Sequence, residues 1–472
     1  MTSGNPTMTE TDRIRTDVDA LRHSFAAKKT LPLETRKALL RQLRAMLRDN
    51  EAPIAAALNT DLHKPAHETF LTEIGLVLAE IQTHLDYLND WSAPQYTWTS
   101  LSCFPGRSLT LAEPLGVVCI FGTWNYPLHV TLLPLVGAIS AGNCALVRLA
   151  ADGSVDATNA VLADLMATYL DTDIVRAVRG SLDVSKEVLA QRFDLIFCTG
   201  GPVIGKAVAR AAAEHLTPIV LELGGKTPAI VDATADLEVS AKRLAWGAFI
   251  NGGQTCVRPD HIFVATEVGD AFVAALQKAL VDLFTATPET SADYGRVANV
   301  QQLFKMKALV EKEKAYLVHG GDCNVTTRFV APSLFNYKDD MAAFNASALM
   351  DDELFGPLLP IVYYSDLDAV LETIRFKPKP LALYVFSRNE DRIQAALQHT
   401  SSGSVVINDC VMQMGNLNLP FGGVGGSGLG TYHGQRSFTT FSHTKAVLRK
   451  YFWLHRTLAA ADTLLNSMLV PK

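Results

Sequence analysis

Cys256 is the residue of this sequence best placed to act as a covalent nucleophile. It ends the run Asn-Gly-Gly-Gln-Thr-Cys, which directly follows a stretch with helical periodicity. Two adjacent glycines let the backbone approach a ligand closely, and a nucleophilic cysteine needs exposure and a way to become a thiolate. A lone cysteine is usually a structural thiol, but this context favours a reactive one. The seven cysteines include no pair at metal-ligand spacing, so we expect no metal site.

Glu222 is the candidate for a general base. It lies near the end of the short apolar run Ile219–Leu223, which is followed by Gly-Gly and Lys226. Ligands bind at the carboxyl ends of strands in a parallel sheet, and a carboxylate between two leucines would be partly desolvated, with a raised pKa. The alternative is a strand-end glutamate paired with Lys226. These residues alone leave both interpretations open.

The side-chain amide of Asn125 could stabilise negative charge that develops on a reacting oxygen. Asn125 belongs to the run Gly122–Pro127, which directly follows a predicted strand. The alternative is an ordinary turn residue before Pro127, and this hexapeptide alone favours that alternative.

Three glycine-containing stretches could contact a cofactor. Thr199–Gly205 lies between a predicted strand and a predicted helix, where glycines let a pyrophosphate sit at the helix N-terminus. Taken alone, Glu353–Pro357 indicates a helix that ends at Gly-Pro, and Leu419–Gly430 indicates backbone packed close to another group. The last stretch is not a P-loop because no Lys-Ser/Thr follows it.

These residues belong to an alternation of short apolar runs and helical segments. Strands are predicted at 117–121, 144–149, 174–178, 194–198 and 219–223. Such alternation is typical of parallel βαβ units, so we expect an α/β fold with a doubly wound nucleotide-binding domain. A second α/β series follows, helices precede the first series, and residues 92–106 indicate a protruding hairpin.

Taken together and in this order, the motifs resemble the aldehyde dehydrogenase superfamily, with Glu222 and Cys256 set 34 positions apart. The short N-terminus, the Gly-Thr-Trp-Asn-Tyr-Pro motif and Thr431–Gly434 resemble its class 3 branch, which acts on fatty and aromatic aldehydes. The resemblance implies three parts, to which periodicity adds a C-terminal amphipathic helix. The expected bounds are 1–91 and 107–223 for the dinucleotide-binding domain, 224–411 for the catalytic domain, 92–106 and 412–450 for an oligomerisation element, and 451–472 for the helix.

The resemblance also implies the reaction, which is NAD(P)-dependent oxidation of an aldehyde to its carboxylic acid. Cys256 would form a thiohemiacetal and then a thioester, Glu222 would be the general base, and Asn125 with the Cys256 backbone N–H would form the oxyanion hole. The residues implied to contact NAD or NADP are Thr123, Trp124, Arg148, Gly200, Gly201, Gly205, Leu223, Gly224, Glu353 and Phe355. Those implied to line the aldehyde tunnel are Tyr126, Trp246 and His433, and Gly415 would lie near its mouth.

The sequence departs from the family pattern at two places. Where the family usually has Lys-Pro-Ser-Glu, this chain has Arg148-Leu-Ala-Ala151, with Asp152 one residue further on. An acidic residue favours a free ribose 2′-hydroxyl and arginine favours a 2′-phosphate, so we hypothesise that NADP is used at least as well as NAD. In addition, Gly201 replaces a common serine, and we expect weaker cofactor binding there.

Expectations about partners and location come from the same sources. The class 3 resemblance implies a homodimer. The apolar face of the C-terminal helix would dock on protein, and weak contact with a membrane surface, aided by Lys445, Arg449 and Lys450, is the open alternative. The formal net charge of −6 gives no electrostatic footprint for nucleic acid. With no signal peptide and no long apolar run, we expect a cytoplasmic protein.

Two rival functions use the same residues. One is a cofactor-independent thiol esterase, and the other is a structural or binding protein that kept the fold without turnover. An assay for reduced nicotinamide with an aldehyde, beside an ester assay without cofactor, distinguishes all three.

Overall fold

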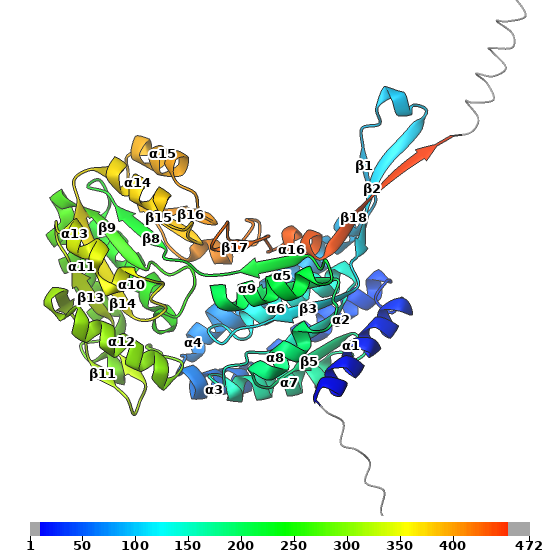
Figure 1. Cartoon of the computed structure of the whole chain (residues 1–472), viewed down its shortest axis with the longest axis horizontal. Coiled ribbons are helices and arrows are strands. Elements are labelled where there is room, and N and C mark those ends of the chain that lie inside the picture. The colour runs from blue at the N-terminus through cyan, green and yellow to red at the C-terminus, as the bar shows by residue number, and fades with distance from the viewer. Residues whose placement is uncertain (1–9, 452–472) are drawn as a thin grey trace, which may run out of the picture.

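A computed structural model describes residues 10–451, and the predicted C-terminal helix lies outside them. The described chain forms two α/β halves side by side, from which a small sheet projects (Figure 1). Within residues 10–451, no helix is both long and apolar enough to cross a membrane. The predicted α/β fold class with parallel sheets is confirmed.

The first half is built on a six-stranded sheet in the order β17-β7-β6-β3-β4-β5. Its strands are β3 (Val117–Phe121), β4 (Cys144–Arg148), β5 (Val175–Val178), β6 (Leu195–Thr199), β7 (Ile219–Glu222) and β17 (Gly428–Leu429). All neighbours are parallel except β17, which runs antiparallel to β7 and pairs Gly428 with Glu222. The central strands β3, β4 and β6 form because each is a short, mostly apolar run that is buried on both faces.

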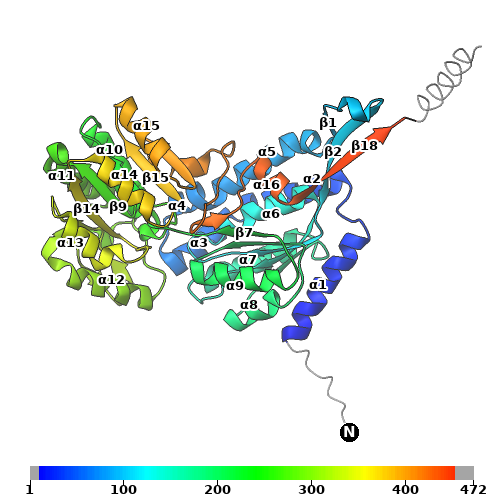
Figure 2. The ribbon, with the colours of Figure 1, turned by 45° about the horizontal axis from the view of Figure 1, so that its top comes forward.

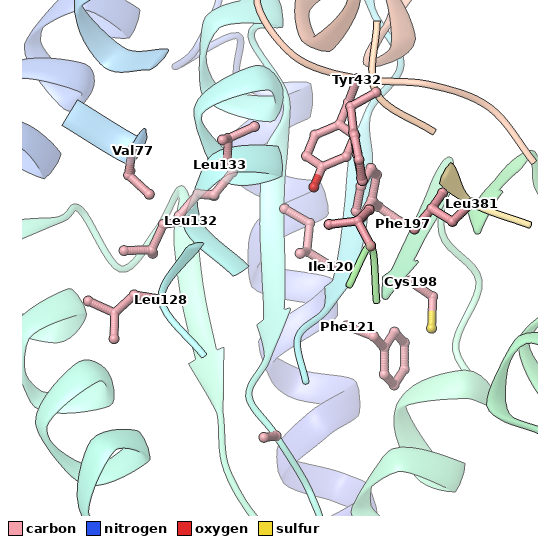
Figure 3. Close-up of a cluster of buried hydrophobic side chains, with 14 of the residues drawn as sticks. Val77, Ile120, Phe121, Leu128, Leu132, Leu133, Phe197, Cys198, Leu381 and Tyr432 are labelled. Carbon is pink, nitrogen blue, oxygen red and sulfur yellow. The ribbon is translucent and has the colours of Figure 1, made fainter. Parts of the chain in front are cut away.

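Helices pack around this sheet, and the first of them make up the N-terminal region of the chain. They are α1 (Glu10–Ala26), α2 (Leu33–Asp49), α3 (Glu51–Leu62), α4 (Ala66–Thr69), the π-helix η1 (Phe70–Ile74), α5 (Gly75–Ser92), α6 (His129–Ala141), α7 (Asp156–Tyr169), α8 (Leu182–Leu189), α9 (Pro202–Ala213) and α16 (Gln435–Thr440). Every residue of α6 is buried, because α2, α5 and α16 pack around it as well as β3 and β4. In Figure 3, Leu128, Leu132 and Leu133 belong to the same apolar cluster as Ile120 and Phe197.

The second half is built on a seven-stranded sheet in the order β10-β13-β14-β9-β8-β15-β16. Its strands are β8 (Pro228–Val231), β9 (His261–Ala265), β10 (Leu317–His319), β13 (Ser333–Asn336), β14 (Leu358–Tyr364), β15 (Ala382–Phe386) and β16 (Ser404–Ile407), and a small pair joins β11 (Cys323–Asn324) to β12 (Phe329–Val330). The helices are α10 (Leu237–Phe249), α11 (Gly269–Phe284), α12 (Val300–Lys312), α13 (Met341–Ala346), α14 (Leu367–Phe376) and α15 (Glu390–His399).

A three-stranded antiparallel sheet projects from the first half (Figure 2). It consists of β1 (Gln95–Thr97), β2 (Gly106–Pro114) and β18 (Ser442–Lys450), and β18 pairs with β2 along its whole length. The segment after residue 412 therefore supplies strands to two sheets, since β17 joins the first half. The domain bounds predicted from the sequence stay a prediction.

Candidate active site

Cys256 and Glu222 line the same cavity, which has a volume of about 190 Å³. Two of the predicted tunnel residues, Tyr126 and Trp246, line it too, and so does Gly415, beside which a Cβ would meet open space. The cavity lies at the carboxyl end of β7, between the two halves of the molecule. Further lining residues without a predicted role are Leu71, Thr72, Leu76, His129, Val130, Met412, Met414, Phe421 and Tyr432.

The loop before Cys256 is held in an unusual backbone conformation. It begins with the turn η3 (Ile250–Gly253), in which Asn251, Gly252 and Gly253 all have positive φ. A Cβ on Gly253 would lie 2.5 Å from the carbonyl oxygen of Gly356, so this position requires glycine. Strained backbone of this kind persists where the surrounding structure holds it, often at functional sites.

The Cys256 thiol needs help to ionise. Burial raises its pKa to about 12, and the nearby carboxyl groups of Glu353 and Glu222 contribute in the same direction. The backbone N–H groups of Cys256 and Val257 lower the pKa of the thiol but do not offset the effect of burial. A base is therefore needed to remove the thiol proton.

Glu222 is the last residue of β7 and has the properties of a buried acid. Its side chain is 3% exposed, and neither carboxyl oxygen has a hydrogen-bond partner among residues 10–451. Burial raises its pKa well above 4.5. The alternative pair with Lys226 is not formed, because the Lys226 ammonium lies 2.5 Å from Asp260 and donates to the Leu349 carbonyl.

Asn125 lies in the turn after β3 and is tied to the loop of the nucleophile. Its side-chain Nδ2 donates to the Gln254 carbonyl at 3.1 Å, and its own carbonyl accepts from Asn251 Nδ2 at 2.8 Å. Next to it, the hydroxyls of Tyr126 and Thr255 lie 2.6 Å apart. An amide nitrogen carries two N–H groups and the contact with Gln254 uses one, so the other can serve a reacting oxygen.

The turn between β6 and α9 fits a pyrophosphate group. Gly201 is the N-cap of α9 and supplies no side-chain cap, and Pro202 at the first helical position has no N–H, so the N–H groups of Val203 and Ile204 are left to bind an anion. The hydroxyl oxygen of Thr199 is buried without a partner among the described residues. A Cβ on Gly205 would lie 2.9 Å from the Leu223 side chain, which explains the close packing of α9 on β7.

Glu353 and Phe355, which the sequence predicts to contact the cofactor, lie beside Gly224 and Trp124. A Cβ on Gly224 would lie 2.1 Å from the Glu353 carboxyl group, so glycine at position 224 lets that carboxyl group occupy its observed position. Burial raises the pKa of Glu353 to about 8. Phe355 has a φ of +48°, and its ring lies 5.4 Å from that of Trp124. Over residues 10–451, no cluster of His, Cys, Asp and Glu could hold a metal ion.

Arg148 is not available for the role predicted from the sequence. It is 1% exposed, and its guanidinium donates to the carbonyls of Leu149, Gly180 and Ser181 and to the Ser185 hydroxyl, at 2.6–3.1 Å. All of its nitrogens are thereby engaged within the protein. The hypothesis that Arg148 favours a 2′-phosphate loses its basis, because this side chain instead fastens the loop after β5.

His433 does not line the cavity that contains Cys256. It lines a second cavity, with Tyr87 and Trp91 of α5, while its neighbour Tyr432 faces the first. The resemblance did not fix which of the two neighbours faced the sulfur. The sequence also gave no sign of Leu71 and Thr72, because no motif marks the π-helix that contains them.

Comparisons with known proteins agree with this geometry. The model of the aldehyde dehydrogenase family matches residues 3–447. A dimeric NADP-preferring aldehyde dehydrogenase of Canis lupus familiaris is 40% identical over 431 residues, which cover 91% of this chain and 93% of that protein. Aldehyde dehydrogenase family 3 member A2 of Rattus norvegicus is 39% identical, with 92% of this chain and 88% of that protein covered.

Among solved structures, the substrate-bound state of Staphylococcus aureus AldH superposes with a TM-score of 0.90 at 36% sequence identity, covering 93% of this chain and 94% of that one. The match of a family model over nearly the whole chain, together with these relatives, is decisive: the chain belongs to the aldehyde dehydrogenase family.

Proposed function

We propose that this aldehyde dehydrogenase oxidises its substrate through a covalent bond to Cys256, with Glu222 as the base. The observation that carries the proposal is that a cysteine and a buried glutamate, unpaired among residues 10–451, line one cavity. When bound, NAD or NADP supplies the acceptor for the hydride. The work of the chain's own residues is to bind the aldehyde, to hold charge and to move protons.

Glu222 takes the proton of the Cys256 thiol and passes it to solvent, the thiolate attacks the carbonyl carbon, and the carbonyl oxygen becomes an oxyanion. The Cys256 backbone N–H and the free N–H of the Asn125 amide donate to it, and by analogy each such donor lowers the barrier by about 3–4 kcal/mol. Once the carbon has reached the oxidation level of a thioester, Glu222 removes a proton from water. The hydroxide attacks the thioester carbon, the carboxylic acid leaves and the Cys256 thiolate is restored.

Residues at the start of α9 and around Glu353 would hold the cofactor. The free N–H groups of α9 beside Gly200, Gly201 and Gly205 suit its pyrophosphate, and Glu353, with Thr123, Trp124, Leu223, Gly224 and Phe355, would surround its nicotinamide end. Relatives named NADP-preferring support the use of NADP as well as NAD. This support comes from the relatives and not from Arg148.

The cavity walls favour an aldehyde with an apolar body. Leu71, Leu76, Met412, Met414 and Phe421 line the cavity with Tyr126 and Trp246. Methionine adapts to different shapes, and the open space beside Gly415 leaves room at one end. We therefore expect better turnover of long aliphatic or aromatic aldehydes than of short ones.

Assembly and location complete the proposal. Relatives named dimeric support a homodimer. The predicted contact of the C-terminal helix with protein or membrane lies outside the described residues, and the cytoplasmic location stays a prediction from the sequence.

One experiment tests the chemistry. Purified wild-type protein and Cys256→Ala are compared by reduced-nicotinamide absorbance with NAD and with NADP, using a panel of short, long and aromatic aldehydes. The variant should keep its fold by circular dichroism and lose turnover. Substantial turnover in Cys256→Ala would mean that another thiol is the nucleophile, and hydrolysis of an ester without aldehyde oxidation would favour the esterase.

A further inference from the structure

A fully buried ion pair lies directly beneath the turn that carries Asn125. Lys64 and Glu73 are both 0% exposed, and their charged groups are 2.6 Å apart. The Lys64 ammonium also lies 4.3 Å from the centre of the Tyr126 ring. Burying an ion pair contributes little net stability compared with apolar side chains of the same size. Stability alone therefore does not account for this pair.

Both partners hold the backbone of the turn. Lys64 Nζ donates to the Asn125 carbonyl at 3.2 Å. The second oxygen of Glu73 accepts the N–H groups of Leu128 and His129, each at 3.0 Å, where α6 begins. The N-cap residue of α6, Leu128, has no side chain that can accept these N–H groups, so Glu73 caps the helix in its place. The turn is thus fixed at its start by Lys64 and at its end by Glu73.

The same carbonyl connects the ion pair to the nucleophile loop. The Asn125 oxygen also accepts from Asn251 Nδ2, and that amide reaches the Gln254 carbonyl at 3.3 Å. The Asn125 side chain donates to this Gln254 carbonyl as well. The position of the Asn125 side-chain N–H relative to Cys256 therefore depends on where Lys64 holds the Asn125 backbone.

We propose that Lys64, held by Glu73, is a positioning residue for the oxyanion donor Asn125. Lys64 lies behind the turn and lines no part of the Cys256 cavity, so it acts through Asn125 and not on the substrate. The inference rests on the proposed function, in which Asn125 donates to the oxyanion. Loss of Lys64 should then weaken turnover more than binding, because the misplaced donor acts on charge that develops during the reaction.

The test is a double-mutant cycle on the full-length enzyme with Lys64→Met, Asn125→Ala and the combined variant. Removing one oxyanion donor lowers kcat by about 10²–10³-fold. Lys64→Met, which displaces the donor without removing it, should lower kcat by about 10–100-fold and change KM by less than about threefold. In the Asn125→Ala background, Lys64→Met should lower kcat further by less than about threefold, since the amide that Lys64 positions is already absent. Additive losses, or a Lys64→Met enzyme with wild-type kcat, would overturn the proposal.

Arg36→Met is the matched control. Arg36 is also a buried cation, and it donates to the Ser140 carbonyl at the opposite end of α6. This variant should lower the melting temperature without the selective loss of kcat. If Lys64→Met does not fold, Glu73→Gln takes its place in the same cycle, because its amide group has one acceptor where the carboxylate has two. If Cys256→Ala also retains turnover, the proposed function fails; if it is inactive while the cycle is additive, only the role of Lys64 fails.

Discussion

At the scale of single residues, burial controls which groups of the site carry protons. It raises the pKa of Cys256 to about 12, that of Glu353 to about 8, and that of Glu222 well above 4.5. A general base must be ionised to accept a proton. Turnover should therefore fall as the pH drops below the raised pKa of Glu222.

Glu68 allows a test of burial on a carboxyl group that lines no part of the Cys256 cavity, although Lys64, Asn251 and Glu73 also affect its pKa. It is 5% exposed, one oxygen has no partner among residues 10–451, and burial raises its pKa from 4.5 to about 7. The folded state therefore binds this proton more tightly than the unfolded state. The resulting stability is fully present below pH 4.5 and is lost as the pH rises through about 7.

We expect Glu68→Gln to raise the free energy of unfolding at about pH 8 by on the order of 1–3 kcal/mol, and to change it little near pH 4.5. Urea unfolding at both pH values measures the effect, with Glu51→Gln on the surface of α3 as the control. An equal effect at both pH values would show that Glu68 does not carry a raised pKa.

Arg148 distinguishes an arginine that supports a loop from one that selects a cofactor. Because its guanidinium donates to the carbonyls of Gly180 and Ser181, we expect Arg148→Met to lower the melting temperature. The ratio of kcat/KM for NADP to that for NAD should change less than about threefold, which is roughly 0.7 kcal/mol. Steady-state kinetics with both cofactors and a thermal melt check this. A tenfold fall in the ratio with an unchanged melting temperature would restore the sequence-based role.

The sequence could not have revealed this role of Arg148. The motif comparison placed it at the end of a strand, which is correct, since it ends β4. Its hydrogen-bond partners, however, belong to the next strand and the loop after it. The sequence of one segment does not show which other segment it will contact. His433 illustrates the same limit, because the side to which a residue faces depends on local φ and ψ, and its φ is +83°.

At the scale of secondary structure, the strands of the first half were predictable and the projecting sheet only partly so. β3 was predicted with its observed bounds because it is a buried apolar run between turns. β18 was not predicted as a strand because most of its side chains are exposed, and its partner β2 lies more than three hundred residues away in the chain. The π-helix η1 likewise has no sequence signature, although it carries Glu73.

The start of α9 is the element on which cofactor binding can be tuned. Gly201 has a φ of −85° and a ψ of 171°, a conformation open to any residue, and a Cβ there would meet nothing within 4 Å. Gly201→Ser should therefore fit and add a hydroxyl beside the pyrophosphate. One net hydrogen bond of about 0.5–1.5 kcal/mol predicts a KM for NAD or NADP that is about 2–10-fold lower.

Gly205→Ala, one turn further along α9, provides the contrast. Its Cβ would press on the Leu223 side chain at 2.9 Å, so Leu223, beside the proposed nicotinamide site, must shift. This variant should raise the KM for the cofactor and lower the melting temperature. Steady-state titrations of both cofactors compare the two variants, and a higher KM in Gly201→Ser would contradict the placement of the pyrophosphate at this turn.

At the scale of the whole molecule, the projecting sheet is the surface on which we expect a second subunit to bind. Large apolar side chains are exposed on it and on its connecting turn: Tyr96 at 67%, Trp98 at 85%, Leu101 at 85% and Phe104 at 65%. Its outer strands β1 and β18 each have only β2 as a neighbour. Exposed apolar groups beside unpaired strand edges mark an association surface, which fits the homodimer proposed from relatives named dimeric.

We therefore expect sedimentation velocity at micromolar concentration to give a particle of twice the chain mass. The double variant Trp98→Asp with Leu101→Asp should shift it toward the monomer, because two charges would have to be desolvated at the interface. Leu216→Asp is the matched control, since Leu216 is 90% exposed but follows α9 and is not part of the projecting sheet. A wild-type monomer with full turnover would refute the dimer, whereas a dimer unaffected by the double variant would place the interface on another surface.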